Sequence, residues 1–133
     1  MNRKIIFYDG VCALCNWFVL FVIKIDRSGI FYFVAQESST AKEIAQQSNV
    51  SFTPGESIVL LDESRGVLYQ KSDAVLFVFA TVGGLWHLAR LAHLVPKIVR
   101  DYIYDLIARN RYRIFGKYEA CPLPPSELRA RFL

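Results

Sequence analysis

The stretch that decides the fold is KIIFYDGVCALC, residues 4–15. Residues 4–8 form a mostly apolar run that ends at Asp9-Gly10, which predicts a buried strand followed by a turn. From Cys12 onward, apolar residues recur every three or four positions, which predicts a helix to about Ile25. Cys12 and Cys15 therefore lie in the first turn of a helix that directly follows a strand.

The same alternation of strand and helix patterns continues along the chain. Apolar and β-branched runs predict strands at 30–34, 57–61 and 67–70, and helical periodicity predicts helices at 41–48, 73–82, 85–94 and 96–112. A capping box of Thr40 and Glu43 is expected to start the first of these helices, and Ser72 is expected to cap the second.

The order of these elements is β-α-β-α-β-β-α followed by further helices. This order predicts an α/β fold of the thioredoxin-like kind, with a mixed four-stranded sheet and helices on both faces. We expect residues 1–133 to form one domain. Its core would span about 1–83, and a C-terminal helical extension would span about 84–133.

Composition excludes several classes of protein. A hydrophobic fraction of 53% argues against disorder, and three cysteines are too few for a disulfide-framed secreted module. The apolar run before Asp9 is too short for a signal peptide, so the expected location is cytoplasmic. Residues 74–95 are long enough to span a membrane but contain Arg90 and two histidines, so we interpret them as buried helix, with membrane contact as the lesser alternative.

The pair Cys12 and Cys15 is the feature that carries chemistry. A helix start offers unpaired N–H groups and partial positive charge, which lower the pKa of a thiol there. The thiolate attacks disulfides, so we expect Cys12 to be the nucleophile and the deeper Cys15 to resolve the mixed disulfide. Asp9 either transfers a proton or caps the helix, and a capping carboxylate near Cys12 would raise the pKa of Cys12.

A zinc site is the main alternative for the same cysteines. Zinc would need two further ligands, and the sulfur and imidazole side chains left in the sequence are Cys121, His87 and His93. They form no second closely spaced pair, so we predict no metal and no other cofactor. The rival to an enzyme is therefore a non-enzymatic zinc-binding or redox-sensing interaction module.

Other residues have a plain and a functional interpretation. Cys121 is either a small packed or exposed residue or a third redox thiol, and His87 and His93 are more typical of helix surface than of ligands. Trp17 and Phe18 are expected in the core, although one could line an apolar substrate groove.

Residues 96–133 hold eight Lys/Arg and four Asp/Glu, which accounts for the whole net charge of +4. The basic cluster there comprises Arg109, Arg111, Arg113 and Lys117 with Tyr112 and Tyr118. We expect it to stabilise a helix end or to face an acidic partner or a membrane, and we do not expect nucleic acid.

The string Tyr8-Asp9-Gly10-Val11-Cys12-Ala13-Leu14-Cys15-Asn16 resembles the DCC family of predicted thiol-disulfide oxidoreductases. Further stretches resemble the same family: Ser72-Asp73-Ala74, Tyr104-Asp105, Ala108-Arg109-Asn110-Arg111-Tyr112, Phe115-Gly116 and Arg131-Phe132-Leu133. The resemblance implies a thioredoxin-like fold and exchange or reduction of disulfides. The partners would be a disulfide-containing protein or small molecule and a thiol electron donor. One departure from thioredoxin chemistry concerns the cis-proline that usually faces the cysteines, because Pro54 lies slightly before the expected position.

Overall fold

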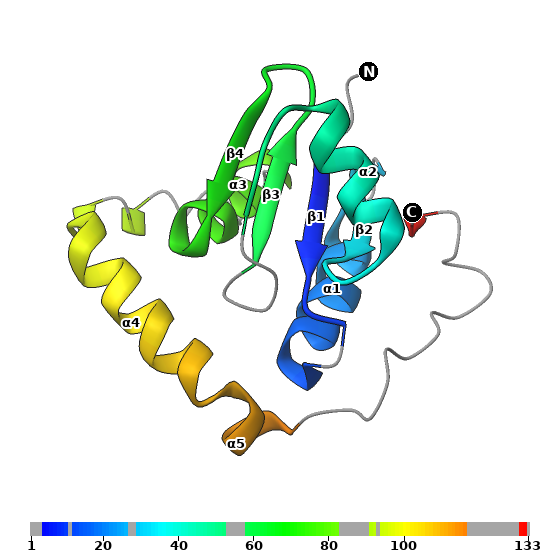
Figure 1. Cartoon of the computed structure of the whole chain (residues 1–133). Coiled ribbons are helices and arrows are strands. Elements are labelled where there is room, and N and C mark those ends of the chain that lie inside the picture. Colours follow the sequence, from blue (N-terminus) through cyan, green and yellow to red (C-terminus); the bar gives the residue numbers. More distant parts are fainter. Residues whose placement is uncertain are drawn as a thin grey trace.

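The structure, a computed structural model, describes residues 4–10, 12–26, 29–52, 58–82, 91–92, 94–116 and 131–132. Its helices and strands follow the predicted order (Figure 1). They are β1 (Lys4–Tyr8), α1 (Ala13–Ile25), β2 (Phe31–Ala35), α2 (Ser39–Gln47), β3 (Val59–Asp62), β4 (Val67–Gln70), α3 (Lys71–Val82), α4 (Lys97–Arg109) and α5 (Arg111–Phe115).

The strands form one four-stranded mixed sheet in the order β2-β1-β3-β4. β1 pairs in parallel with β2 and antiparallel with β3, and β3 and β4 form an antiparallel hairpin. This arrangement confirms the predicted α/β fold, which is consistent with a thioredoxin-like architecture. Because β1 is a central strand, its carboxyl end lies near the middle of one end of the sheet. The cysteine pair, which follows β1, lies there too.

Helices cover both faces of the sheet, with α1 and α3 on one side and α2 on the other (Figure 1). Alternate residues of β1 supply the two cores, because side chains of a strand point to opposite faces. Ile6 and Tyr8 pack against α1 and α3, whereas Ile5 and Phe7 pack against α2. The two buried cores fix β1 from both sides, so the strand is a rigid base for the turn that follows it.

Two helix starts differ from the sequence prediction. The N-cap of α2 is Ser38, whose hydroxyl accepts the N–H of Ala41 at 3.2 Å, so the capping box at Thr40 was wrong. The extended backbone of Ser38 allows this bond, and Thr40 already lies inside the helix. Ser72 also lies inside a helix, since α3 begins at Lys71, and its hydroxyl donates to Asp101 instead of capping.

Where a single helix was expected from 96 to 112, the described residues form α4 and then α5. The chain leaves helical geometry at Asn110, where φ is −102° and ψ is 5°, and the Asn110 side chain donates to the Leu106 carbonyl at 2.7 Å. Side-chain bonds of this kind compete with the helix backbone and favour a break. The helix expected at 85–94 lies mostly outside the described residues.

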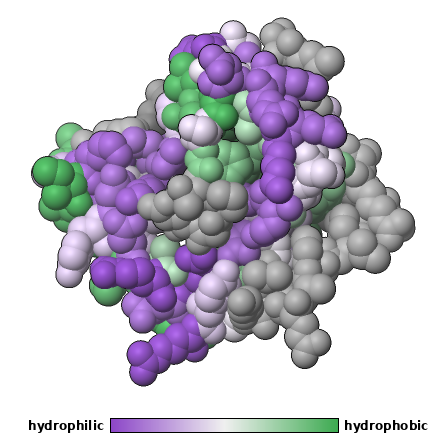
Figure 2. Space-filling model, viewed as in Figure 1, coloured by the Kyte–Doolittle hydropathy of each residue, from purple (hydrophilic) through white to green (hydrophobic). Residues whose placement is uncertain are grey.

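Much of α4 is exposed although it carries many apolar side chains, among them Ile98, Tyr102 and Leu106. In Figure 2 hydrophilic residues predominate on this face of the molecule, and one group of hydrophobic residues lies at the left edge, over the start of α4. Within the described part of the chain, no helix combines the length and the apolar character needed to cross a membrane.

A residue near the end of the chain pairs with β2, which is an edge strand of the sheet. Phe132 forms a parallel bridge with Phe33 of β2, and its ring lies 5.6 Å from the ring of Phe33. Arg131 donates to the carboxylate of Asp26 at 2.6 Å and to the Phe31 carbonyl at 2.8 Å. Asp26 is the C-cap residue of α1, so this contact ties the chain end to the far end of the helix that carries the cysteines.

Candidate active site

The turn between β1 and α1 is held by backbone and side-chain hydrogen bonds. The Cys12 N–H donates to the Asp9 carbonyl at 3.1 Å. The Asn16 amide donates to the carbonyls of Gly10 and Cys12 at 2.8 and 2.9 Å. Cys12 itself is the N-cap residue of α1, with extended backbone geometry. The sequence thus places one cysteine at the helix start and the other within its first turn.

The two thiols have opposite environments. The Cys12 sulfur accepts the Cys15 N–H at 3.3 Å. A side-chain hydrogen bond from Cys15 lowers the pKa of Cys12 to about 6, helped by backbone N–H groups and the positive charge of Arg111 and opposed by burial. The same side-chain bond, together with burial and the negative charge on Cys12, raises the pKa of Cys15 far above its ordinary value. Near neutral pH, Cys12 is therefore a thiolate and Cys15 remains protonated.

Asp9 is buried at the end of β1 and receives two side chains from the C-terminal helices. Arg111 lies 3.1 Å from the Asp9 carboxylate, and the hydroxyl of Tyr112 donates to the same oxygen. Since Cys12 is the N-cap of α1, the capping role considered for Asp9 belongs to Cys12. The ion pair also changes what we expect for the pKa of Cys12. The Arg111 guanidinium offsets the negative charge of Asp9, which by itself would raise this pKa.

A cavity of about 90 Å³ lies between these groups. Its lining residues are Asp9, Leu14, Cys15, Ile58, Tyr104, Ile107, Ala108 and Arg111. The Tyr104 hydroxyl accepts the Ile58 N–H at 2.8 Å, and burial raises the pKa of Tyr104 to about 12. The cavity is large enough for water, and polar groups line part of its wall. Asp9 and Cys15 thus line the same cavity.

Gly116 connects the C-terminal extension to the start of α1. Its φ of 95° lies in the left-handed region, which favours glycine because other residues carry a Cβ there. The Gly116 carbonyl accepts the Ala13 N–H at 3.3 Å, directly beside Cys12. Cys12 has 0% of its surface exposed, whereas Cys15 is only partly buried, so the expectation that Cys15 is the deeper cysteine was wrong. The extension therefore contacts the dithiol turn, and a substrate can reach the Cys12 sulfur only after local opening.

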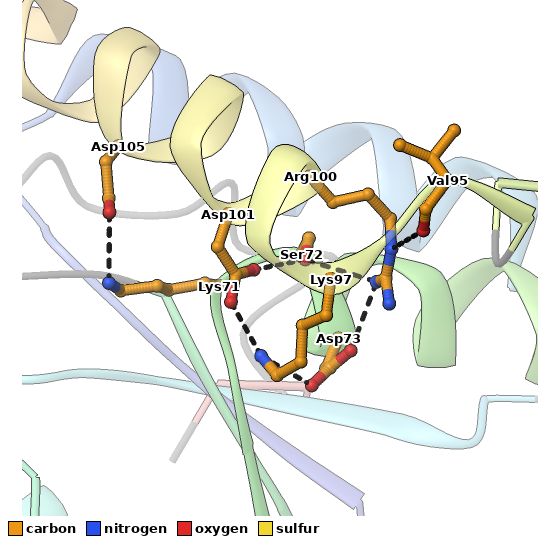
Figure 3. Close-up of polar contacts among 8 residues, drawn as sticks. All are labelled: Lys71, Ser72, Asp73, Val95, Lys97, Arg100, Asp101 and Asp105. Carbon is orange, nitrogen blue, oxygen red and sulfur yellow. Dashed lines mark hydrogen bonds and ion pairs between the residues drawn. The ribbon is translucent and has the colours of Figure 1, made fainter.

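A polar network holds α4 against the start of α3, which fixes the position of the extension (Figure 3). Arg100 donates to Ser72 and to Asp73 at 3.2 and 3.1 Å. The other ion pairs of the network are Lys97–Asp73, Lys97–Asp101 and Lys71–Asp105, at 3.1, 2.6 and 3.1 Å. Through this attachment, α4 brings Tyr104 to the cavity, and α5 brings Arg111.

An apolar groove of about 460 Å³ lies beside the cysteine pair. It is lined by Ala13, Leu14, Trp17 and Phe115, so the two residues between the cysteines form part of its wall. Trp17 is 59% exposed and stacks on Phe21, whereas Phe18 packs against the core. Of the two aromatic residues weighed from the sequence, Trp17 is therefore the one that lines a groove.

Comparison with known proteins identifies the family. A family profile described as DCC1-like thiol-disulfide oxidoreductase matches residues 6–117. The chain belongs to this family. The uncharacterized protein YuxK of Bacillus subtilis is 39% identical over 131 residues, which cover 98% of this chain and 94% of YuxK. A DCC family protein of Arabidopsis thaliana, named as chloroplastic, is 36% identical over 123 residues, which cover 92% of this chain and 70% of that protein. No solved structure matches the chain.

The residues expected to act together in this DCC family member lie in one site, because Asp9, Cys12 and Cys15 occupy a single turn. Cys121, His87 and His93 lie outside the described residues, as do residues 53–57 with the question of the cis-proline. Within the described ranges, no three His, Cys, Asp or Glu side chains are grouped as a metal site would require.

The sequence analysis missed three residues of the site: Tyr104, Arg111 and Tyr112. Arg111, expected in a basic surface cluster, is mostly buried and binds Asp9, whereas Tyr112 is exposed and also donates to Asp9. Arg111 also donates to the Ala108 carbonyl near the end of α4, which agrees with the expected role of the cluster at a helix end. Helical spacing was the available signal. Tyr104, Ile107, Ala108 and Arg111 follow the i, i+3, i+4, i+7 pattern of one helix face, and all four line the cavity.

Proposed function

We propose that the chain is a dithiol oxidoreductase that reduces disulfides through Cys12 and Cys15. The Cys12 thiolate attacks one sulfur of a substrate disulfide, which forms a Cys12–substrate disulfide and releases the other sulfur as a thiolate. The Cys15 thiol loses its proton and attacks the Cys12 sulfur. This step closes a Cys12–Cys15 disulfide and releases the second substrate thiolate, so two electrons pass to the substrate. An external thiol reductant then restores the dithiol.

The observation that carries this proposal is the contrast between the two sulfurs. Cys12 accepts a hydrogen bond at a helix start and has a lowered pKa, while the pKa of the partly buried Cys15 is raised. A nucleophilic thiolate beside a protonated resolving thiol is the arrangement that ordered disulfide exchange requires. The family description supports the same general chemistry.

Asp9 is the proposed proton acceptor for Cys15. Both side chains line the same cavity, and the negative charge of Asp9 acts on the Cys15 sulfur. Water in the cavity would carry the proton between them. A base at this position is needed because burial disfavours the Cys15 thiolate, and this effect remains after Cys12 has become a neutral mixed disulfide.

The first test is a titration of each thiol in the reduced protein. We expect Cys12 to ionise with a midpoint near pH 6, well below the usual thiol value of about 8.5, and Cys15 to stay protonated throughout. Thiolate absorbance in the ultraviolet reports ionisation without requiring access to the sulfur, and mass spectrometry after alkylation assigns it. Bound zinc is assayed in the same sample. Ordinary midpoints for both thiols, or stoichiometric zinc, would replace this proposal by the metal-binding alternative.

The groove predicts how polypeptide substrates are held beside the dithiol. Trp17→Ser is expected to raise KM for a disulfide-bonded peptide by about threefold to tenfold, because an exposed tryptophan next to a reactive group supplies apolar contact. The kcat should change little. Leu20→Ser is the matched control, since Leu20 is 46% exposed on the same helix but does not line the groove. Equal KM values for the two variants would show that the groove does not bind substrate.

A cytoplasmic location is part of the proposal, because thiol-based reduction operates where other thiols are kept reduced. The substrate would be a protein or small-molecule disulfide, and the electron donor a second dithiol system.

A further inference from the structure

Arg111 and Asp9 form a buried ion pair that links the C-terminal helices to the dithiol turn. The guanidinium lies 3.1 Å from the carboxylate, and the two side chains are 12% and 6% exposed. Ion pairs this well shielded interact strongly, and loss of one partner leaves an uncompensated charge. We therefore expect this pair to affect the site more strongly than an exposed ion pair would.

The contacts of Arg111 fix its orientation. Its guanidinium donates to the Ala108 carbonyl at 2.8 Å and lies 4.7 Å from the centre of the Tyr112 ring. Tyr112 in turn donates to the same Asp9 oxygen that Arg111 binds. Two donors on one oxygen, one of them a planar guanidinium anchored at its other end, restrict rotation of the carboxylate.

Few charged groups surround the two sulfurs. Among the described residues, those that line the cavity or contact Asp9 are Asp9 from the end of β1, Tyr104 from α4, and Arg111 and Tyr112 from α5. Arg111 is the single cation in this set. Without it, no described residue of this set would bring a positive charge to the Cys12 thiolate or to the Asp9 carboxylate, whose negative charge acts on Cys15.

We propose that Arg111 is a positioning residue for disulfide exchange, which holds the Asp9 carboxylate at the cavity beside Cys15 and supplies a positive charge near Cys12. This inference rests on the proposed function and assigns a role in it to the C-terminal extension. The extension would then be a working part of the site, since α5 supplies the cation that binds Asp9 and acts on the Cys12 thiolate.

The competing explanation is that Arg111 only tethers the extension to the core. The chain contains a matched control, because Arg131 forms a second buried pair with Asp26, at 2.6 Å, that also ties a C-terminal segment to the core. Asp26 caps the opposite end of α1 from Cys12. A helix of 13 residues is about 20 Å long, so this pair is too distant to influence the dithiol strongly.

The experiment compares Arg111→Met with Arg131→Met in the reduced full-length chain. Arg111→Met is expected to raise the midpoint of Cys12 ionisation by about one pH unit or more and to slow resolution of a preformed mixed disulfide about tenfold. Arg131→Met is expected to lower the melting temperature and leave both quantities unchanged. If both variants lose stability and neither shifts the midpoint, Arg111 is a tether and the proposal is overturned.

Two further variants test whether Arg111 acts through Asp9. Arg111→Lys keeps the charge, so its midpoint should stay within about half a pH unit of the original. In an Asp9→Asn background, Arg111→Met should still raise the Cys12 midpoint, because the guanidinium also acts on the thiolate directly, but it should no longer slow resolution of the mixed disulfide, because sites that act together are not additive. An equal slowing of resolution in both backgrounds would mean that Arg111 does not act through Asp9, which overturns the positioning role.

The titration of Cys12 does not depend on exchange activity. The proposed function and the role of Arg111 can therefore be refuted independently of each other. A chain that shows the expected shift but exchanges no disulfide would refute the proposed function and retain the charge coupling. An active chain whose Arg111→Met variant titrates like the original would retain the function and refute the role of Arg111.

Discussion

Cys12→Ser is expected to abolish disulfide exchange, with a loss of at least about a thousandfold in the rate of substrate reduction. A serine hydroxyl is not ionised near neutral pH, so the variant lacks the attacking anion, and burial raises the pKa of Cys15, the other thiol of the described residues. The measurement is reduction of a disulfide-bonded protein by the variant in the presence of excess thiol reductant.

Cys15→Ser should behave differently from Cys12→Ser. Attack by Cys12 remains possible, but no resolving thiol follows, so the chain should accumulate as a mixed disulfide with its substrate, visible by mass spectrometry. Cys121→Ser is the matched control and should exchange disulfides like the unchanged chain. Full activity in Cys12→Ser would exclude the proposed mechanism, and loss of activity in Cys121→Ser would make Cys121 the third redox thiol.

Most of the fold could be predicted because its elements have strong local signals. The apolar run at 4–8, the turn at Asp9-Gly10 and the helical spacing after Cys12 are each decided within a few residues, and the structure has β1 and α1 at these positions. The start of α2 could not be predicted as well. Both Ser38 and Thr40 suit an N-cap, and the choice depends on how the chain leaves β2, which is a tertiary feature.

The candidate site was only half predictable, because one part is local and the other is not. Cys12, Cys15 and Asp9 stand within one turn of sequence, so their relation follows from the strand and helix that flank them. Arg111 reaches Asp9 across a separation of 102 residues. The fact that a buried carboxylate needs a partner was available from the sequence, but the identity of that partner depends on where α4 and α5 pack.

The residues that resemble the family outside the cysteine motif have related structural roles. Ser72 and Asp73 attach α4 to α3, and Gly116 turns the chain so that its carbonyl meets Ala13. At the chain end, Arg131 holds Asp26 at the far end of α1. Local sequence signals do not account for the resemblance at these residues. The contacts give the residues a structural role, because each one fixes α1 or the helices that reach its first turn.

Asp9→Asn is expected to leave the first step of exchange largely intact and to slow the second. The amide cannot accept a proton from Cys15, and burial still raises the pKa of Cys15 after Cys12 has become a neutral mixed disulfide. A positioned general base typically contributes about a hundredfold or more, so resolution of the mixed disulfide should slow by about that factor near neutral pH. Rapid-quench kinetics of single turnovers separates the two steps.

The pH dependence distinguishes loss of a base from loss of structure. With Asp9 absent, Cys15 must lose its proton to solvent, so the slow second step should accelerate steadily as pH rises, whereas a distorted site would stay slow at every pH. Asp62→Asn is the matched control, since Asp62 is also buried but lies at the end of β3, where its carboxylate accepts the Ser64 hydroxyl. A normal second step in Asp9→Asn would mean that the cavity water or another group removes the proton, and Asp9 would then have no part in the chemistry.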